Sequence, residues 1–292
     1  MFSGLYTAMV TPFANGKIDY DAVKKIIEMQ IKAGVDGIVP MGTTGESPTV
    51  SFEEHKEFIK EVVSMVNGRV KIIAGTGSNS TEEAICLSQS AENNGVDALL
   101  LVNPYYNKPT QKGLVAHFET IARAVSIPIV LYNIPGRTGV NFLPESVFEL
   151  INRVPNIVAI KEATGDIAQM MRVIELCGEK LTLLSGDDNL LLPVLGIGGK
   201  GVISVLSNLI PADIKKIITS FNEGNINECR SLFYKLLPLC RAMFLETNPI
   251  PVKAGMELLG YCSSELRLPM TEISEQNRAI LRKSLIDYGI SL

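Results

Sequence analysis

The feature that most constrains the fold of this chain is a series of short apolar runs, each four to six residues long and rich in Val, Ile and Leu. The runs occupy residues 6–10, 37–41, 70–74, 98–102, 127–132, 157–160, 181–184 and 202–206. Each is too short for a helix and too continuously apolar for a strand with one face in water, which is typical of strands buried on both faces. The pattern therefore predicts eight parallel strands.

Helical segments with start and stop signals separate these runs. Ser51 with Glu54 and Ser80 with Glu83 match the capping box, and Gly34 and Gly95 lie where helices would end. No G-x-G-x-x-G follows the first strand, and the nearest imitation, at 196–201, precedes the last strand and is interpreted as a turn. Eight alternating units predict an α/β fold of the closed (β/α)8 TIM-barrel type rather than an open doubly wound sheet.

Only helical periodicity remains toward the end of the chain, over 225–246, 251–259 and 272–288. We expect a barrel catalytic domain at 1–224 and a C-terminal helical domain at 225–292.

Composition limits the classes of function. A net charge of −4, a pI near 5.4 and the lack of a dense basic cluster argue against nucleic-acid binding. No apolar run reaches the ~18 residues of a membrane span and Met1 begins without a basic leader, so we expect a cytoplasmic protein that does not bind membranes. Five scattered cysteines and two histidines predict no metal site, and Asp187-Asp188 is interpreted as a loop and helix start.

The strand ends carry polar clusters, and in a β/α barrel those ends form the active rim. Lys161 is the most informative of these residues, because burial of an ammonium is costly and a desolvated lysine can attack a ketone to form a Schiff base. By strand parity Ile157, Ala159 and Lys161 face one way, into the barrel mouth. The alternative is a side chain that reaches out to water at the end of its strand.

Three further candidates lie on the same rim. Tyr132 ends the neighbouring strand and could move protons, or it could be a core aromatic. Thr43 and Thr44, flanked by glycines, could bind a small carboxylate, or they could form a plain tight turn. Arg137 presents a planar fork suited to a carboxylate, or it is an ordinary surface arginine.

Three motifs in order resemble the class I, lysine-dependent pyruvate aldolase family, which includes N-acetylneuraminate lyase and dihydrodipicolinate synthase. They are Gly42-Thr43-Thr44-Gly45-Glu46, Tyr132-Asn133-Ile134-Pro135 and Ile160-Lys161-Glu162. Within the family, the stretch from Tyr132 to Gly139 with its arginine, and Asn103-Pro104-Tyr105-Tyr106, are similar to the dihydrodipicolinate synthase branch.

The resemblance implies a lyase without metal or organic cofactor that condenses pyruvate with L-aspartate 4-semialdehyde to 4-hydroxy-tetrahydrodipicolinate, in lysine and diaminopimelate biosynthesis. It implies a homotetramer built as a dimer of tight dimers. The resemblance implies that Lys161 forms the imine and that Tyr132, Thr43 and Tyr106 form a proton relay, in which Tyr106 comes from a neighbouring subunit. It implies that Thr44 binds the pyruvate carboxylate and that Arg137 binds the carboxylate of the semialdehyde. Gly186 and Ile203 would contribute backbone contacts near the site.

Many family members also bind lysine as an inhibitor at the tight-dimer interface. The matching positions here are Ser47, Pro48, Phe52, His55, Asn79, Glu83 and Tyr105. Phe52 stands where sensitive enzymes often carry histidine, and a hydrocarbon ring cannot replace that polar contact, so we expect weak or absent inhibition.

Two other functions stay open on the sequence. One is a Schiff-base pyruvate aldolase of the same family that acts on a sugar acid, from which Arg137 would separate this chain. The other is a catalytically silent barrel that binds a metabolite and regulates a partner, which would have no need for Lys161, Tyr132, Thr43 and Tyr106 together.

Overall fold

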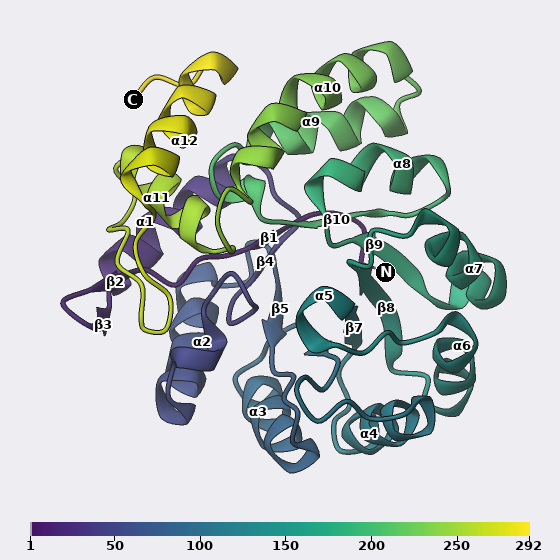
Figure 1. Cartoon of the computed structure of the whole chain (residues 1–292). Helices are drawn as coiled ribbons and strands as arrows, with labels where there is room; N and C mark the ends of the chain where they lie inside the picture. Colours follow the sequence, from purple (N-terminus) through teal and green to yellow (C-terminus); the bar gives the residue numbers. More distant parts are fainter. Residues whose placement is uncertain (1) are drawn as a thin grey trace.

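A computed structural model describes residues 2–292, and its centre is a closed barrel of eight parallel strands with neighbour order β1-β10-β9-β8-β7-β6-β5-β4 (Figure 1). The barrel strands are β1 (Gly4–Ala8), β4 (Gly37–Val39), β5 (Lys71–Gly75), β6 (Ala98–Val102), β7 (Ile129–Asn133), β8 (Ile157–Glu162), β9 (Thr182–Ser185) and β10 (Gly201–Ser204). Each corresponds to one of the eight apolar runs, so the predicted (β/α)8 barrel is confirmed.

Helices connect the strands on the outside of the barrel. They are α1 (Tyr20–Lys32), α2 (Phe52–Val66), α3 (Thr81–Asn93), α4 (Gln111–Arg123), α5 (Pro135–Thr138), α6 (Pro144–Arg153), α7 (Ile167–Cys177), α8 (Leu191–Gly196) and α9 (Pro211–Asn222). A two-stranded hairpin, β2 (Phe13–Ala14) with β3 (Lys17–Ile18), follows the first strand and was not predicted. Among residues 2–292, no helix combines the length and the apolar character needed to cross a bilayer.

The strands are buried on both faces, as their continuous apolar sequence requires. At least one inward side chain from each strand fills the barrel interior; the inner layer includes Tyr6, Val39, Ile73, Leu100, Val130, Ala159, Leu184 and Ile203. The outward side chains join a larger apolar layer between the strands and the helices.

The register between β7 and β8 shifts by one residue, since Ile129 pairs with Ile157 while Val130 pairs with Ala159. Ile157 therefore packs in the outer layer and Ala159 in the inner one. The predicted common direction of Ile157 and Lys161 is wrong because this bulge adds a residue, whereas Ala159 and Lys161 do share the inner face.

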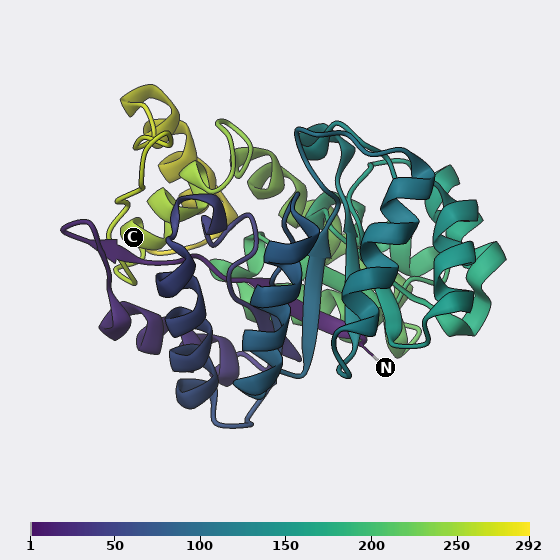
Figure 2. The ribbon, with the colours of Figure 1, turned by 90° about the horizontal axis from the view of Figure 1, so that it is seen from below.

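Three helices follow the barrel: α10 (Ile226–Ala242), α11 (Ile250–Leu258) and α12 (Glu275–Tyr288). α10 packs on α9 and α12, and α11 also contacts α12. Figures 1 and 2 both place α11 and α12 on the side of the barrel that carries α1, opposite α6 and α7. The domain boundary that we propose between residues 224 and 225 falls in the turn between α9 and α10.

Candidate active site

Lys161 and Tyr132 are direct neighbours across β7 and β8. Each side chain is only 5% exposed, and Lys161 Nζ lies 4.1 Å from the centroid of the Tyr132 ring. The neighbour of Lys161 is thus a phenol ring, and the salt bridges of residues 2–292 do not include this lysine. An amine held in a nearly dry site without a carboxylate partner is suited to act as a nucleophile.

Gly186, directly after β9, leaves room for the Lys161 side chain. A Cβ atom at this position would lie 2.6 Å from Ala163 Cβ and 3.2 Å from Lys161 Cε. The Gly186 amide donates to the Glu162 carbonyl at 2.7 Å, which fixes the chain beside the lysine. Ile203 is fully buried in the inner layer with Tyr132. The structure therefore places Gly186 next to Lys161 and Ile203 in the inner layer of the same barrel.

Behind these two strands, Asn133 and Glu162 form a buried amide-carboxylate contact. Asn133 Nδ2 donates to both carboxylate oxygens of Glu162, at 3.3 and 3.2 Å, and the Thr164 amide donates to the same group at 3.0 Å. Burial raises the pKa of Glu162, while these donors oppose the rise. Because Asn133 follows Tyr132 and Glu162 follows Lys161, the contact fixes the two chemically important residues relative to each other.

The interpretation of Asp187-Asp188 as a loop and helix start is confirmed, because a short 3-10 helix (Asp188–Leu190) begins at Asp188. The Asp188 side chain does not cap a helix: the carboxylate is buried and accepts hydrogen bonds from the amides of Val205 and Leu206, at 3.0 and 2.9 Å. It thereby ties the loop after β9 to the end of β10. Burial raises the pKa of both Asp187 and Asp188, and the positive charge of Lys161 opposes the rise in each.

Thr43 and Thr44 lie in the turn after β4. Thr44 is 2% exposed, and its hydroxyl accepts a hydrogen bond from Asn248 Nδ2 at 3.1 Å. Thr43 and Tyr132 line the same small cavity, of about 30 Å³, at the mouth of the barrel. The turn thus presents one threonine toward Tyr132 and holds the other in a buried hydrogen bond.

Arg137 lies in the short helix α5, which begins directly after Ile134. Its Nη2 donates to the backbone carbonyl of Asn248 at 2.9 Å. The guanidinium is therefore anchored through one nitrogen and keeps other donors for a ligand.

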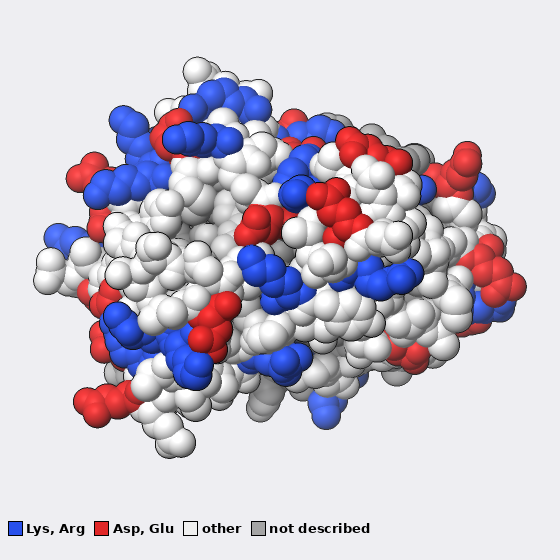
Figure 3. Space-filling view, turned by 90° about the horizontal axis from the view of Figure 1, so that it is seen from above, with Lys and Arg blue, Asp and Glu red and all other residues white. Residues whose placement is uncertain are grey.

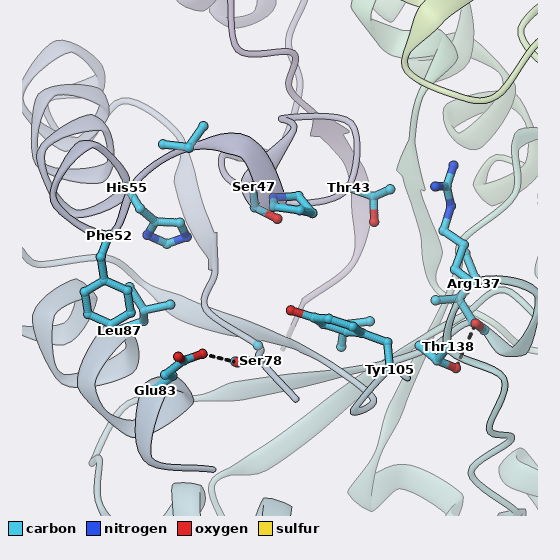
Figure 4. A pocket seen from close by; sticks show the side chains of 15 residues that line it. Thr43, Ser47, Phe52, His55, Ser78, Glu83, Leu87, Tyr105, Arg137 and Thr138 are labelled. Carbon is cyan, nitrogen blue, oxygen red and sulfur yellow. Dashed lines mark hydrogen bonds between the residues drawn. The ribbon is translucent and has the colours of Figure 1, made fainter. Parts of the chain in front are cut away.

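A cavity of about 360 Å³ connects this rim with the cleft between α2 and α3. In Figure 4, Thr43, Arg137 and Thr138 lie on one side, Phe52, His55 and Glu83 on the other, and Tyr105 between them. On the face shown in Figure 3, acidic and basic side chains are mixed, in agreement with the modest net charge.

The structure brings together six of the seven positions that match a lysine site in the family. Ser47, His55, Glu83 and Tyr105 line the 360 Å³ cavity, together with Pro48 and Phe52. Asn79 does not line it, but its Nδ2 donates to the Tyr105 carbonyl at 3.1 Å. Burial lowers the pKa of His55 to about 4, so this imidazole is neutral at pH 7.

Tyr106 is the one predicted relay member that the chain does not bring to Lys161. Its side chain is 91% exposed and its backbone adopts a left-handed conformation, with φ of 74°. The preceding Tyr105 is fixed by Asn79, and Asn107 Nδ2 donates to the Asn79 carbonyl at 2.9 Å. The loop therefore presents Tyr106 outward from an anchored base.

Asn248, Glu46 and Lys253 were not predicted as site residues, although they contact the rim. The signal for Lys253 was present: it stands in the apolar stretch Ile250-Pro251-Val252-Lys253-Ala254, a pattern like that around Lys161. Its partner Glu46 lies 207 residues away in the sequence, so the pairing could not be seen there.

Comparisons with known proteins agree with this geometry. The family model described as "Dihydrodipicolinate synthetase family" matches residues 1–287. The chain is 59% identical over 275 residues to a 4-hydroxy-tetrahydrodipicolinate synthase of Leptospira biflexa, covering 94% of this chain and 93% of the relative.

Two solved structures are similar over nearly their whole length. Dihydrodipicolinate synthase from Aquifex aeolicus superposes with a TM-score of 0.98 at 46% identity, covering 100% of this chain and 99% of that one. The chloride-inhibited enzyme from Acinetobacter baumannii complexed with pyruvate gives a TM-score of 0.97 at 42% identity, covering 100% of both chains. With its barrel, its buried lysine and these matches, the chain belongs to the dihydrodipicolinate synthetase family.

Proposed function

We propose that this chain is a 4-hydroxy-tetrahydrodipicolinate synthase, which condenses pyruvate with L-aspartate 4-semialdehyde in lysine and diaminopimelate biosynthesis. The observation that carries the proposal is Lys161, held nearly dry beside Tyr132 at the barrel mouth, with Thr43 and Arg137 on the same rim. Family membership and the relatives' names support the choice of reaction.

The first half of the reaction takes place at Lys161. The free-amine form of its Nζ attacks the ketone carbon of pyruvate, and loss of water from the carbinolamine leaves an iminium. Removal of a methyl proton then gives an enamine. Tyr132, whose ring centroid lies 4.1 Å from Nζ, carries these protons, and Thr43, which lines the same small cavity as Tyr132, is the next member of the relay. Thr44 holds the pyruvate carboxylate.

The second half forms the ring. The enamine carbon attacks the aldehyde carbon of the semialdehyde, and the amino group of that substrate then displaces Lys161 from the former ketone carbon. One water is released overall, and the lysine is regenerated. Arg137 binds the carboxylate of the semialdehyde, since its fork has donors beyond the one used on the Asn248 carbonyl.

The rival substrate class is a sugar acid. Arg137 favours the semialdehyde, because a charged fork matches a second carboxylate better than a chain of hydroxyls. A silent regulatory barrel would not require a desolvated lysine that lacks a carboxylate partner.

The active assembly contains at least two copies of the chain, with a homotetramer as the full assembly. Tyr106 supports this part of the proposal, because it is 91% exposed on an anchored loop and cannot serve its own Lys161 from there. The relay would be completed when Tyr106 enters the site of a neighbouring subunit.

The cavity beside Ser47, His55, Glu83 and Tyr105 is a candidate lysine site with weak affinity. Phe52 lines it, and Lys56 Nζ lies 4.7 Å from the centre of the Phe52 ring. A cationic ligand would therefore meet a hydrocarbon ring with a positive charge beside it, instead of a polar partner.

A coupled assay tests the proposed function. Pyruvate with L-aspartate 4-semialdehyde should give 4-hydroxy-tetrahydrodipicolinate, and a panel of sugar acids should be cleaved at least about a hundredfold less efficiently. Faster turnover of any sugar acid than of L-aspartate 4-semialdehyde would assign the chain to the sugar-acid aldolases. Inactivity with all of these substrates would favour the catalytically silent regulatory barrel.

A further inference from the structure

The chain buries a second lysine, and it does so more completely than the first. Lys253, in α11, is 0% exposed. Its Nζ donates to Glu46 Oε1 at 2.7 Å and to the carbonyls of Thr11 at 2.9 Å and Glu265 at 2.5 Å. It also lies 4.3 Å from the centre of the Phe13 ring. Every donor of this ammonium therefore has a partner, in contrast to Lys161.

An ion pair buried this deeply needs a reason. Side-chain exposure is 0% for Lys253 and 2% for Glu46, and burial of two charges stabilises a fold little compared with a well-packed apolar pair. Burial lowers the pKa of Lys253, and the charge of Glu46 opposes that fall. What the pair does provide is a fixed geometry between α11 and the loop after β4.

Glu46 closes the turn that carries Thr43 and Thr44. The residues at the two ends of this turn, Met41 and Glu46, both adopt left-handed backbone conformations, with φ of 55° and 56°. Such conformations are strained for residues other than glycine and persist only where the surroundings enforce them. The second carboxylate oxygen of Glu46 accepts the Arg267 amide at 3.2 Å, so both oxygens hold this end of the turn.

Asn248 makes the adjoining contacts from the same C-terminal segment. Its Nδ2 donates to the Thr44 hydroxyl at 3.1 Å, and its carbonyl accepts from Arg137 Nη2 at 2.9 Å. Asn248 thus contacts both Thr44 and Arg137, the residues assigned to the carboxylates of the two substrates.

We propose that the Glu46–Lys253 ion pair and the Asn248 side chain are positioning groups that hold the Thr43-Thr44 turn in its catalytic geometry. They act through the turn and do not touch substrate. The proposal rests on the proposed function, because it takes Thr43 and Thr44 as members of the catalytic rim. It also gives the C-terminal segment a role in activity in addition to its packing.

The decisive variant removes both charges at once. Lys253→Met alone leaves Glu46 buried and unpaired, so it should lower both the melting temperature and the activity. In Glu46→Gln/Lys253→Met no charge is left unpaired, so the melting temperature should recover most of that loss. The turn would still lack its anchor, so kcat/KM should stay about tenfold or more below the wild type, with slower imine trapping by pyruvate and borohydride.

Lys215→Met is the matched control. Lys215 pairs with Asp36, which binds the Leu5 amide at the opposite end of the barrel, so its loss should leave kcat/KM unchanged. Asn248→Ala provides a second test of the proposal, in which the Glu46–Lys253 ion pair is kept. It should raise the pyruvate concentration for half-maximal trapping about fivefold or more, and Asn248→Asp, which keeps the shape but places a negative charge beside Thr44, should raise it further.

Each outcome bears on one claim. If the full-length wild type does not trap pyruvate, the proposed function fails. If it does, and a folded double variant has wild-type kcat/KM, the ion pair does not position the turn. Should the double variant fail to fold, Asn248→Ala decides: wild-type saturation by pyruvate in that variant would overturn the proposal.

Discussion

Arg137 is the side chain on which the choice of second substrate depends. Replacement of Arg137 by alanine should lower kcat/KM for L-aspartate 4-semialdehyde by roughly tenfold or more, about 1.4 kcal/mol, because a charge-assisted pair with the substrate carboxylate is lost. Imine formation with pyruvate should continue, since that step uses Lys161 and Thr44.

Steady-state kinetics together with borohydride trapping check this prediction, and Arg137→Lys is the control. Lysine keeps the charge but lacks the planar fork, so its kcat/KM should fall between those of the wild type and Arg137→Ala. Unchanged efficiency in Arg137→Ala, or loss of pyruvate trapping, would show that Arg137 does not serve the semialdehyde.

Single residues could be predicted from the sequence where their chemistry is local. Lys161 stands out because a lysine at the end of an apolar run must be explained, and the structure does place it nearly dry at the barrel mouth. The contacts of Asp188 and Lys253 could not be predicted, because their partners, the amides of Val205 and Leu206 and the carboxylate of Glu46, lie 17, 18 and 207 residues away in the sequence.

At the scale of elements, the eight strands were predictable because burial on both faces leaves a continuous apolar signal. Which side chains point into the barrel was harder to predict. The bulge at Val158 places Ile157 in the outer apolar layer and Ala159 in the barrel interior. Of the two predicted capping boxes, only the first is complete in the structure. Ser51 and Glu54 form the full box, whereas Glu83 binds the Ser78 hydroxyl in place of the Ser80 amide.

Glu54 links the start of α2 to the C-terminal segment, and this link predicts a pH dependence of stability. Arg267 donates to both of its oxygens, at 2.8 and 2.7 Å, and these bonds, aided by the Ser51 amide, lower the pKa of Glu54 to about 2. A carboxyl with a depressed pKa stabilises the fold above its unfolded pKa of ~4.3 and loses that contribution as the pH falls toward 2.

Glu54→Gln should therefore lower the free energy of unfolding by about 1 kcal/mol near pH 6, with allowance for solvent screening at this partly exposed site. The difference from the wild type should shrink between pH 5 and pH 2 in urea titrations. Glu53→Gln is the control, because Glu53 is 86% exposed and pairs only loosely with Lys56. A difference that stayed constant with pH would show that the Arg267 contact does not depend on the charge of Glu54.

At the scale of the whole molecule, Tyr106 is the one proposed relay residue that does not reach Lys161 of its own chain, because its side chain points outward. Tyr106→Phe and Thr43→Val should each be nearly inactive, and mixtures of the two should regain activity, since some mixed dimers would contain one complete relay. Mass spectrometry of the mixed assemblies provides the control for subunit exchange. Mixed dimers without regained activity would place the whole relay in one subunit.

Regulation also belongs to this scale, because the candidate lysine cavity lies between α2 and α3 and reaches the active rim. Lysine titrated against initial rates at subsaturating pyruvate should inhibit only weakly, since loss of one polar contact at Phe52 costs ~1 kcal/mol or more. Phe52→His should increase the affinity about fivefold or more. Strong submillimolar inhibition of the wild type would mean that the lysine site accepts the Phe52 ring without loss of affinity.

The central claim is that Lys161 is the Schiff-base nucleophile, and borohydride reduction in the presence of pyruvate tests it most directly. Peptide mapping by mass spectrometry should find one reduced pyruvyl adduct, on Lys161, in the wild type and none in Lys161→Arg. Lys253, which is buried but paired with Glu46, should remain unmodified and serves as an internal control. An adduct on Lys253 or on any other lysine, or no adduct at all, would contradict the account.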